Sequence, residues 1–288
     1  MATFHAICYN PCRMKLYRVK EGTFLELTDR WLRLEESIDS LLTHENLHSH
    51  LESLAALKAN VAPPVLDHER LAPILSQEVW AAGVTYYRSR DARMEEAETA
   101  AGGDFYDRVY TAERPELFYK SPGSRTVGPG GRVRIRRDAD WNVPEPELTL
   151  VISSQGKIVG YTIGNDMSSR DIEGENPLYL PQAKVYDGSC AVGPCILVLK
   201  KPLPAETEIR MSIQRGGTTA FEDAITLAAL KRSPEELVEY LYRETTYPRG
   251  CLLMTGTGIV PPSSFTLKSG DEIRIRIDPI GTLINRVQ

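Results

Sequence analysis

Two acidic residues separated by one proline, Glu145 and Glu147, begin the segment that most constrains how this chain can fold. Residues 148–153 read as a strand, and residues 157–163 read as its hairpin partner across a Gln-Gly turn. Side chains along a strand alternate with a period of two, so the two glutamates point the same way. The second strand delivers Asp166 at its end. The hairpin therefore predicts three carboxylates gathered at neighbouring strand ends.

A cation is the simplest way to stabilise such a group, because three neighbouring carboxylates repel one another. Three carboxylates with open positions suit a hard divalent ion, which could be Mg²⁺, Mn²⁺ or Ca²⁺. Solvated acids on an edge strand are the competing interpretation, because Glu-x-Glu spacings are common by chance. Pro144 and Pro146 favour the metal site, because proline stiffens the segment and removes backbone donors.

Composition and charge exclude several classes of protein. Hydrophobic residues make up 42% of the chain and charged residues 25%, which is typical of a globular protein with an ordinary core. A net charge of −5 argues against a nucleic-acid partner, which would require a basic face. No apolar run approaches the length of a membrane span, and the first residues lack the layout of a signal peptide. The five cysteines are scattered and odd in number, which indicates a reduced, cytoplasmic protein.

The first quarter of the chain differs from the rest. Residues 1–75 are predicted to form a small N-terminal α/β domain, with a hairpin near 17–27 and a helical stretch over 31–54. Prolines within 62–74 break the helical pattern and mark the predicted linker. The helical stretch contains three histidines that could bind a metal, although histidine-rich exposed helices are commoner and are the interpretation we favour: His44, His48 and His50.

Residues 76–288 are predicted to form the catalytic domain, which consists mostly of short strands and turns. Two helices interrupt them, over 91–101 and 233–244, and the second begins with Ser233 in a capping-box pattern. Many short strands with few helices indicate a β-dominated α+β fold rather than a doubly wound sheet. The expected strands are 81–87, 116–120, 132–136, 148–153, 157–163, 195–199, 208–214, 251–255 and 272–277.

Two further segments carry candidate functional side chains. Lys184 lies eighteen residues past Asp166, and a desolvated lysine beside a cation can act as an acid or base or can hold a carboxylate. Taken alone, Lys184 is more simply a surface lysine. Thr257 follows an apolar strand within Thr-Gly-Thr-Gly, where a hydroxyl and backbone donors suit an anionic group. A plain turn is the alternative there.

Three residues near the first strands of the catalytic domain are weaker candidates. Glu116 precedes an apolar strand, where an acid that caps a turn is the simpler interpretation. Arg88 and Ser89 follow the strand before it, and an arginine at a strand end can grip a carboxylate or begin the next helix. The sequence has no Gly-x-Ser-x-Gly elbow and no Cys/His pairing, so nucleophilic catalysis has no support.

Together these segments resemble the fumarylacetoacetate hydrolase superfamily from about Gln77 to the C-terminus. The resemblance implies a mixed β-roll with a small N-terminal domain, assembled as a homodimer or homotetramer. It also implies that the Mg²⁺ ligands are Glu145, Glu147 and Asp166. The motifs that carry the resemblance are 82–86, Lys120-Ser-Pro, the Glu145–Glu147 pair, 160–171, Lys184, 255–257 and Gly270-Asp271.

One departure from the family separates its branches. The hydrolases carry a histidine and a glutamate that activate the attacking water, and Ser89 and Ala92 stand at these positions here. The remaining pattern looks like the sugar-acid dehydratase branch, typified by 2-keto-3-deoxy-D-arabinonate dehydratase. In that branch Glu116 and Lys184 would be catalytic. Substrate would be bound by Arg88, Ser89, Asp187 and Thr257.

The resemblance therefore implies dehydration of a 2-keto-3-deoxy sugar acid, a small 2-oxo acid, through a metal-stabilised enolate. Lys184 or Glu116 would remove the C3 proton, and the other group would protonate the departing C4 hydroxyl. A pentonate would give 2,5-dioxopentanoate. The same metal site would also serve hydrolysis of an acylpyruvate or a diketo sugar acid, or decarboxylation of oxaloacetate. An alternative from another class is a non-catalytic module that binds sugar acids.

Overall fold

The computed structural model describes residues 13–66, 70–87 and 109–288. The strands are β1 (Met14–Val19), β2 (Gly22–Glu26), β3 (Trp31–Leu34), β4 (Glu78–Gly83), β5 (Glu116–Pro122), β6 (Arg132–Val133), β7 (Asn142–Ile152), β8 (Ile158–Ser169), β9 (Cys190–Val198), β10 (Glu208–Arg215), β11 (Thr218–Thr226), β12 (Cys251–Met254), β13 (Glu272–Ile277) and β14 (Gly281–Val287). The α-helices are α1 (Ile38–Leu41), α2 (Leu47–Leu57), α5 (Arg170–Glu175), α6 (Leu180–Lys184) and α7 (Pro234–Tyr242).

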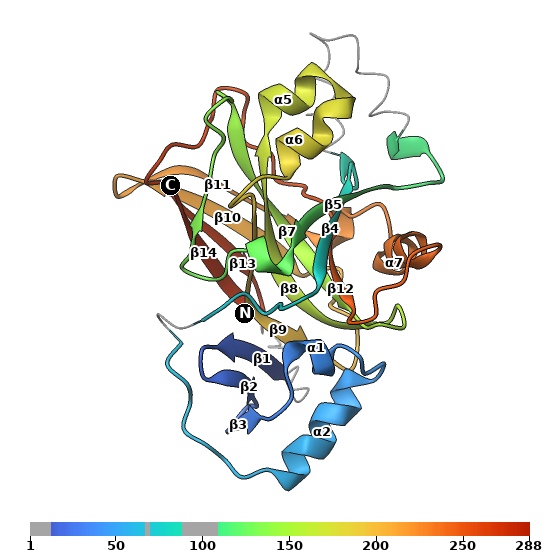
Figure 1. Cartoon of the computed structure of the whole chain (residues 1–288). Helices are drawn as coiled ribbons and strands as arrows, with labels where there is room; N and C mark the ends of the chain where they lie inside the picture. The colour runs from blue at the N-terminus through green and yellow to red at the C-terminus, as the bar shows by residue number, and fades with distance from the viewer. Residues whose placement is uncertain (1–12, 67–69, 88–108) are drawn as a thin grey trace, which may run out of the picture.

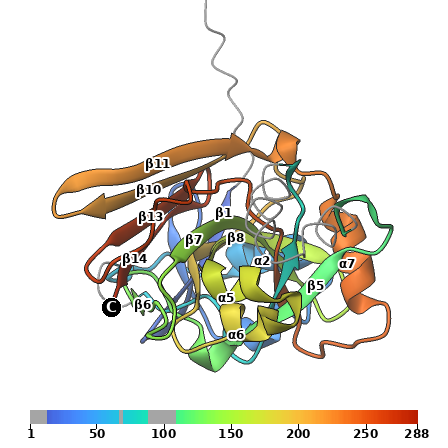
Figure 2. The same cartoon turned by 90° about the horizontal axis from the view of Figure 1, so that it is seen from above.

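Two mixed sheets organise the described part of the chain. The larger has the strand order β3-β2-β1-β9-β8-β7-β12-β4-β5, and the smaller has the order β11-β10-β13-β14-β6. Neighbouring strands are antiparallel except β12–β4 and β14–β6. Figure 2 shows the β10–β11 hairpin reaching out from the side of the molecule. Strands far outnumber helices, so the predicted β-dominated α+β class is confirmed.

The larger sheet is buried on both faces, because alternate side chains of β7 enter two different cores. Leu148, Leu150 and Ile152 pack with residues of the smaller sheet such as Ile275. Val151 packs on the other face in the second core, which includes side chains of the N-terminal strands. The residues of β7 that precede Val151 at a spacing of two therefore point to this second face.

The first strands extend the same large sheet, since β1 pairs with β9 through Leu16 and Ile196. The expected hairpin near 17–27 is confirmed by β1 and β2. The expected helix over 31–54 is wrong at its start, because Trp31–Leu34 forms β3 against β2. Hydrophobic residues three and four apart fit a helix, but here every second residue of the segment is buried. The division at residue 75 remains a prediction.

Several other expected elements shift. β4 starts before residue 81 and ends at Gly83, because Val84 adopts a φ of 50°. β6 stops at Val133, and the next amide, that of Arg134, bonds to Gly188 instead. β11 and β14 were not expected at all. The helix expected over 233–244 is confirmed as α7, whose Ser233 hydroxyl accepts a hydrogen bond from the Glu236 amide.

Two short helices, α5 and α6, are the elements that most affect the candidate site, and the sequence did not predict them. They continue directly from the end of β8 and lie together at the end of the molecule opposite α2 (Figure 1). The helix expected over 91–101 lies outside the described residues. Among the residues that are described, no helix has the length and apolar character needed to span a membrane.

Candidate metal centre and active site

The hairpin of β7 and β8 assembles the three predicted acids. Glu145 pairs with Asp166 across the ladder, and Glu147 pairs with Gly164. The expectation that the acids lie at strand ends is wrong, because the ladder runs on to Asn142 and Ser169. β12 pairs with β7 only from Thr149 onward, so the proline-bearing part of β7 has β8 as its one ladder partner among the described strands. Proline is tolerated at such a local edge.

The three carboxylates form one buried group. One oxygen from each lies within 4.8 Å of the others, and the residues are 3%, 1% and 1% exposed, for Glu145, Glu147 and Asp166 respectively. Gly164 makes room beside them, because a Cβ there would lie 2.4 Å from the Thr149 hydroxyl. We call these three residues the acid centre.

Lys184 lies inside this group rather than on the surface. Its Nζ is 2.6 Å from Glu145 Oε2, 2.6 Å from the Ser168 hydroxyl and 3.3 Å from Asp166 Oδ2. The side chain is 1% exposed. It reaches the acids because α6 folds back over the end of β8 and ends at Lys184. The surface interpretation of this lysine is therefore wrong, because the ammonium is desolvated and paired.

Two more buried cations hold the acid centre, and sequence reasoning assigned a role to neither. Lys120 of β5 places its Nζ 2.5 Å from Asp166 Oδ1, and it donates hydrogen bonds to the backbone carbonyls of Met167 and Lys184. Arg170, the first residue of α5, places Nη2 2.8 Å from Glu145 Oε1. Both residues lie within motifs that carry the family resemblance, which was the one available signal.

Glu147 differs from the other two acids, because its recorded hydrogen bond comes from an uncharged donor, the Gly256 amide. Burial raises the pKa of Glu147 well above its usual range, and the charges of Asp166 and Glu145 raise it further. Burial also raises the pKa of Tyr86, with a further contribution from Glu147. An all-oxygen, buried and strongly acidic donor set fits a hard divalent cation.

Glu116 and Thr257 are close in sequence to residues that contact this centre, Phe118 and Gly256, and their predicted roles stay predictions. Glu116 is on β5 at a spacing of two from Phe118, whose ring centroid is 5.7 Å from the Lys184 Nζ. The half-buried Glu116 carboxylate lies over Gly83, where a Cβ would be 2.1 Å from it. Thr257 is 5% exposed and its hydroxyl accepts a hydrogen bond from the Ile259 amide.

Of the remaining predicted substrate residues, Asp187 is the one that the structure describes. Asp187 is exposed on the surface, where its Oδ1 lies 3.6 Å from Arg125 Nη1. Arg88 and Ser89 fall outside the described residues, as does Ala92. The substrate-binding roles of these residues stay predictions.

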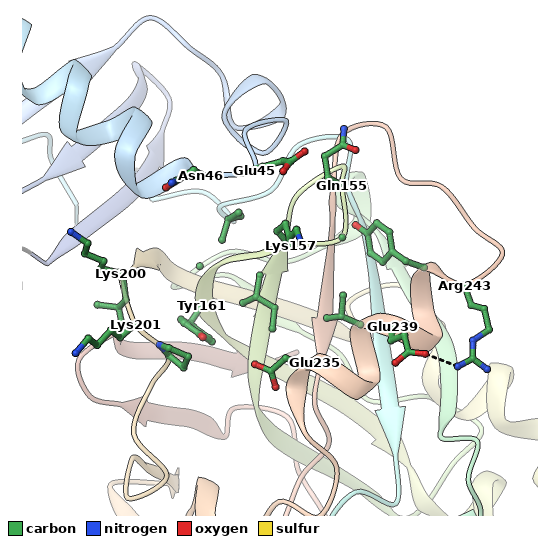
Figure 3. A pocket seen from close by; sticks show the side chains of 18 residues that line it. Glu45, Asn46, Gln155, Lys157, Tyr161, Lys200, Lys201, Glu235, Glu239 and Arg243 are labelled. Carbon is green, nitrogen blue, oxygen red and sulfur yellow. Dashed lines mark hydrogen bonds and ion pairs between the residues drawn. The ribbon is translucent and has the colours of Figure 1, made fainter.

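A separate groove of about 960 Å³ is lined by residues other than the three acids (Figure 3). It is bordered by Glu45 and Asn46 at the start of α2, by the β7–β8 turn, and by Glu235 and Glu239 on α7. Its charged side chains have mixed signs, and it contains none of the predicted site residues. This groove is therefore not the site that the sequence predicted.

Comparison with known proteins agrees with the fold and the site. The family model described as fumarylacetoacetate (FAA) hydrolase C-terminal matches residues 85–288. The chain is 48% identical to a probable 2-keto-3-deoxyxylonate dehydratase of Haloferax volcanii, over 77% of this chain and 76% of that protein. It is 44% identical to the 2-dehydro-3-deoxy-D-arabinonate dehydratase of Saccharolobus solfataricus, over 75% of this chain and 73% of that protein.

A solved structure extends the likeness to the whole fold. It is a 2-keto-3-deoxy-D-arabinonate dehydratase complexed with magnesium and 2,5-dioxopentanoate, with a TM-score of 0.80 and 34% identity. The match covers 96% of this chain and 98% of that one. The two-sheet fold, the buried carboxylates and these matches show that the chain belongs to the fumarylacetoacetate hydrolase family.

Proposed function

We propose that this protein is a hydro-lyase that dehydrates a 2-keto-3-deoxy sugar acid, such as 2-keto-3-deoxy-D-arabinonate, to give 2,5-dioxopentanoate. The observation that carries the proposal is the meeting of three buried carboxylates with a buried lysine, Lys184. This arrangement occurs in a chain whose relatives are named as dehydratases of such acids.

Glu145, Glu147 and Asp166 would hold the divalent cation, which we propose to be Mg²⁺, with Mn²⁺ as a substitute. Such an ion supplies Lewis acidity, which polarises the 2-keto group and makes the neighbouring C3 proton acidic. A neighbour in the same family was solved with magnesium and the dioxo acid together.

The chain itself supplies the groups that move protons. We assign Lys184 and Glu116 as the acid–base pair, in which one takes the C3 proton and the other gives a proton to the C4 hydroxyl. The C4–O bond breaks as the C3–H bond electrons form the new double bond, and water leaves. Phe118 lies against the Lys184 ammonium and keeps bulk water from that side. Tautomerisation of the product then gives the aldehyde.

The test is turnover of 2-keto-3-deoxypentonates of both configurations with Mg²⁺, following the aldehyde, beside acetylpyruvate and oxaloacetate. We expect metal-dependent release of 2,5-dioxopentanoate from one configuration. Lys184→Met should lower kcat by about 10³-fold, within the range of acid–base catalysis, while the exposed Lys157→Met should leave it unchanged. Cleavage of acetylpyruvate without dehydration would overturn the proposal. Tight binding of a sugar acid without any turnover would identify a binding module.

We also propose that the protein works as a homodimer or homotetramer in the cytoplasm, in the breakdown of a pentose, without nucleic-acid or membrane partners. The net charge of −5 and the scattered cysteines support this setting. Light scattering during size-exclusion chromatography tests the assembly, and a monomeric mass at working concentration would overturn it.

A further inference from the structure

Each carboxylate of the acid centre has one oxygen in contact with a donor that belongs to the surrounding framework. Glu145 Oε1 faces the Arg170 guanidinium at 2.8 Å, and Asp166 Oδ1 faces the Lys120 ammonium at 2.5 Å. Glu147 Oε2 accepts a hydrogen bond from the Gly256 amide. These three donors come from α5, from β5 and from the loop after β12, so they approach the acids from three different elements.

The framework donors are held firmly in place. Lys120 is 0% exposed, and it is tied to the carbonyls of Met167 and Lys184 as well as to Asp166. Arg170 is 1% exposed, and its backbone amide bonds to Trp141 at 2.7 Å. The backbone of Gly256 packs closely against Thr85, because a Cβ there would lie 1.9 Å from the Thr85 hydroxyl. None of these donors can swing away without opening the core.

The second oxygens of two of the acids meet a different kind of partner. Glu145 Oε2 and Asp166 Oδ2 both face the Lys184 ammonium, which is the group proposed to move protons. In Glu145 and Asp166, one oxygen therefore faces Lys184 and the other oxygen faces a framework donor. A cation held by the acid centre would meet these carboxylates one oxygen at a time.

We propose that Lys120, together with Arg170 and the Gly256 amide, makes the acid centre selective for a small six-coordinate cation, Mg²⁺ or Mn²⁺, against Ca²⁺. Mg²⁺ takes six ligands at short distances and is satisfied by single oxygens with water or substrate completing the shell. Ca²⁺ takes six to eight oxygens and commonly uses both oxygens of a carboxylate. Lys120 withholds the second oxygen of Asp166, so it is a specificity-determining residue. The inference rests on the metal site of the proposed function but not on the reaction.

The experiment is calorimetric titration of Mg²⁺ and of Ca²⁺ into the metal-free full-length protein, which needs no turnover. The wild-type protein should bind Mg²⁺ more tightly than Ca²⁺. Lys120→Met removes the donor at similar side-chain length, and it should shift the ratio of the two Kd values toward Ca²⁺ by about tenfold or more. Lys184→Met is the matched control, because it also removes one positive charge, but from Glu145 Oε2 and Asp166 Oδ2. It should tighten both ions and leave the ratio within about threefold of the wild type.

An unchanged ratio in Lys120→Met would overturn the proposal, as would a wild-type protein that binds Ca²⁺ as tightly as Mg²⁺. Circular dichroism melts establish whether the variant folds. If it does not, Arg170→Met carries the same prediction through Glu145, and an unchanged ratio there has the same meaning. Failure of all divalent binding in the wild type would instead reject the metal site on which the proposed function depends. Normal selectivity without dehydration would reject the reaction alone.

Discussion

Among the described residues, two clusters each bring three possible metal ligands together, and they differ in burial, in ligand type and in the elements that carry them. The acid centre is buried and made of oxygens carried on long strands. The other cluster lies around the start of α2 on the N-terminal part, with side chains that are 26%, 36% and 25% exposed. We call it the histidine cluster, and its members are Glu36, His44 and His50.

The two clusters shift the pKa of a carboxyl group in opposite directions. In the acid centre, burial and two neighbouring acids raise the pKa of Glu147. In the histidine cluster, burial works in the same direction for Glu36, but the hydrogen bonds and charge of His50, with help from His44, lower its pKa overall. The surroundings of Glu147 disfavour its ionised form, so a bound cation would stabilise that form. Glu36 already has its partners, at 2.7 Å and 3.3 Å.

Ring geometry points the same way. The rings of His44 and His50 are stacked, with centroids 3.7 Å apart and planes inclined by 15°. A metal bound to a ring nitrogen lies close to the plane of that ring. Two nearly parallel planes at this separation leave no position that suits both rings. Proximity of three ligands is therefore insufficient evidence for a metal site, and a carboxylate whose pKa is raised by burial and by neighbouring acids is the stronger sign.

The largest expected effect is a loss of dehydratase activity on substitution in the acid centre, with almost no loss on substitution in the histidine cluster. Asp166→Asn removes a ligand charge from the acid centre at constant shape, and it should lower kcat/KM by about 10³-fold, or about 4 kcal/mol of barrier. His50→Gln should leave kcat/KM within about twofold, because the contacts of that ring are with Glu36 and His44 in the N-terminal part. Steady-state kinetics at saturating Mg²⁺ checks both. Equal losses in the two variants would break the comparison.

The second prediction concerns the backbone that supports the acid centre. Gly256 has a φ of 92°, and a Cβ there would overlap the Thr85 hydroxyl at 1.9 Å. Gly256→Ala should therefore lower the free energy of unfolding by about 3 kcal/mol, from strain and overpacking together. Gly216→Ala is the matched control, since its φ is also positive at 58° but nothing lies within 4 Å. It should cost only about 1 kcal/mol in urea unfolding.

The third prediction is that a substitution in the acid centre makes the metal-free protein more stable, whereas most substitutions lower stability. The pKa of Glu147 is raised in the folded protein, so ionisation costs stability as the pH rises from the unfolded-state value toward the folded one. Glu147→Gln keeps an acceptor for the Gly256 amide and removes this cost. In EDTA at neutral pH the variant should be more stable by about 1–2 kcal/mol, and it should no longer bind metal. If the variant were less stable in EDTA, the neighbouring cations would already stabilise the ionised form of Glu147, and the prediction would be wrong.

Sequence patterns located the acid centre because its three acids come from one hairpin, along which side chains alternate with a period of two. Glu145, Glu147 and Asp166 could be placed together without knowing the rest of the fold. The N-cap of α7 could be predicted for the same reason, because Ser233 and the amide that it accepts from lie three residues apart. Lys120 could not be placed, because its contact with Asp166 requires β5 to fold against a segment about 46 residues away, and no local period reports such a contact.

The same limit explains the errors in the N-terminal part. Trp31 and Leu34 are spaced as a helix would have them, and only pairing with β2 decides that they form β3. The strand β11 has mostly exposed and half-buried side chains, so it lacks the apolar alternation that marks a strand in a sequence. Pairing with other strands determines that these two segments form β3 and β11. The hydrophobic pattern of each segment carries no information about that pairing.

The smallest expected effect tests whether the histidine cluster is only a local ion-pair network. The pKa of Glu36 is lowered in the folded protein, so its contribution to stability is present above its unfolded-state pKa and is lost as the pH falls. Glu36→Gln should cost about 0.5–1 kcal/mol at neutral pH and nothing measurable below about pH 3, because the carboxylate is partly exposed and screened. Turnover should not change. Chemical denaturation at the two pH values, with and without Zn²⁺, provides the check. A zinc-dependent gain in stability that Glu36→Gln abolishes would mean that the rings can open and that this cluster, too, binds a metal.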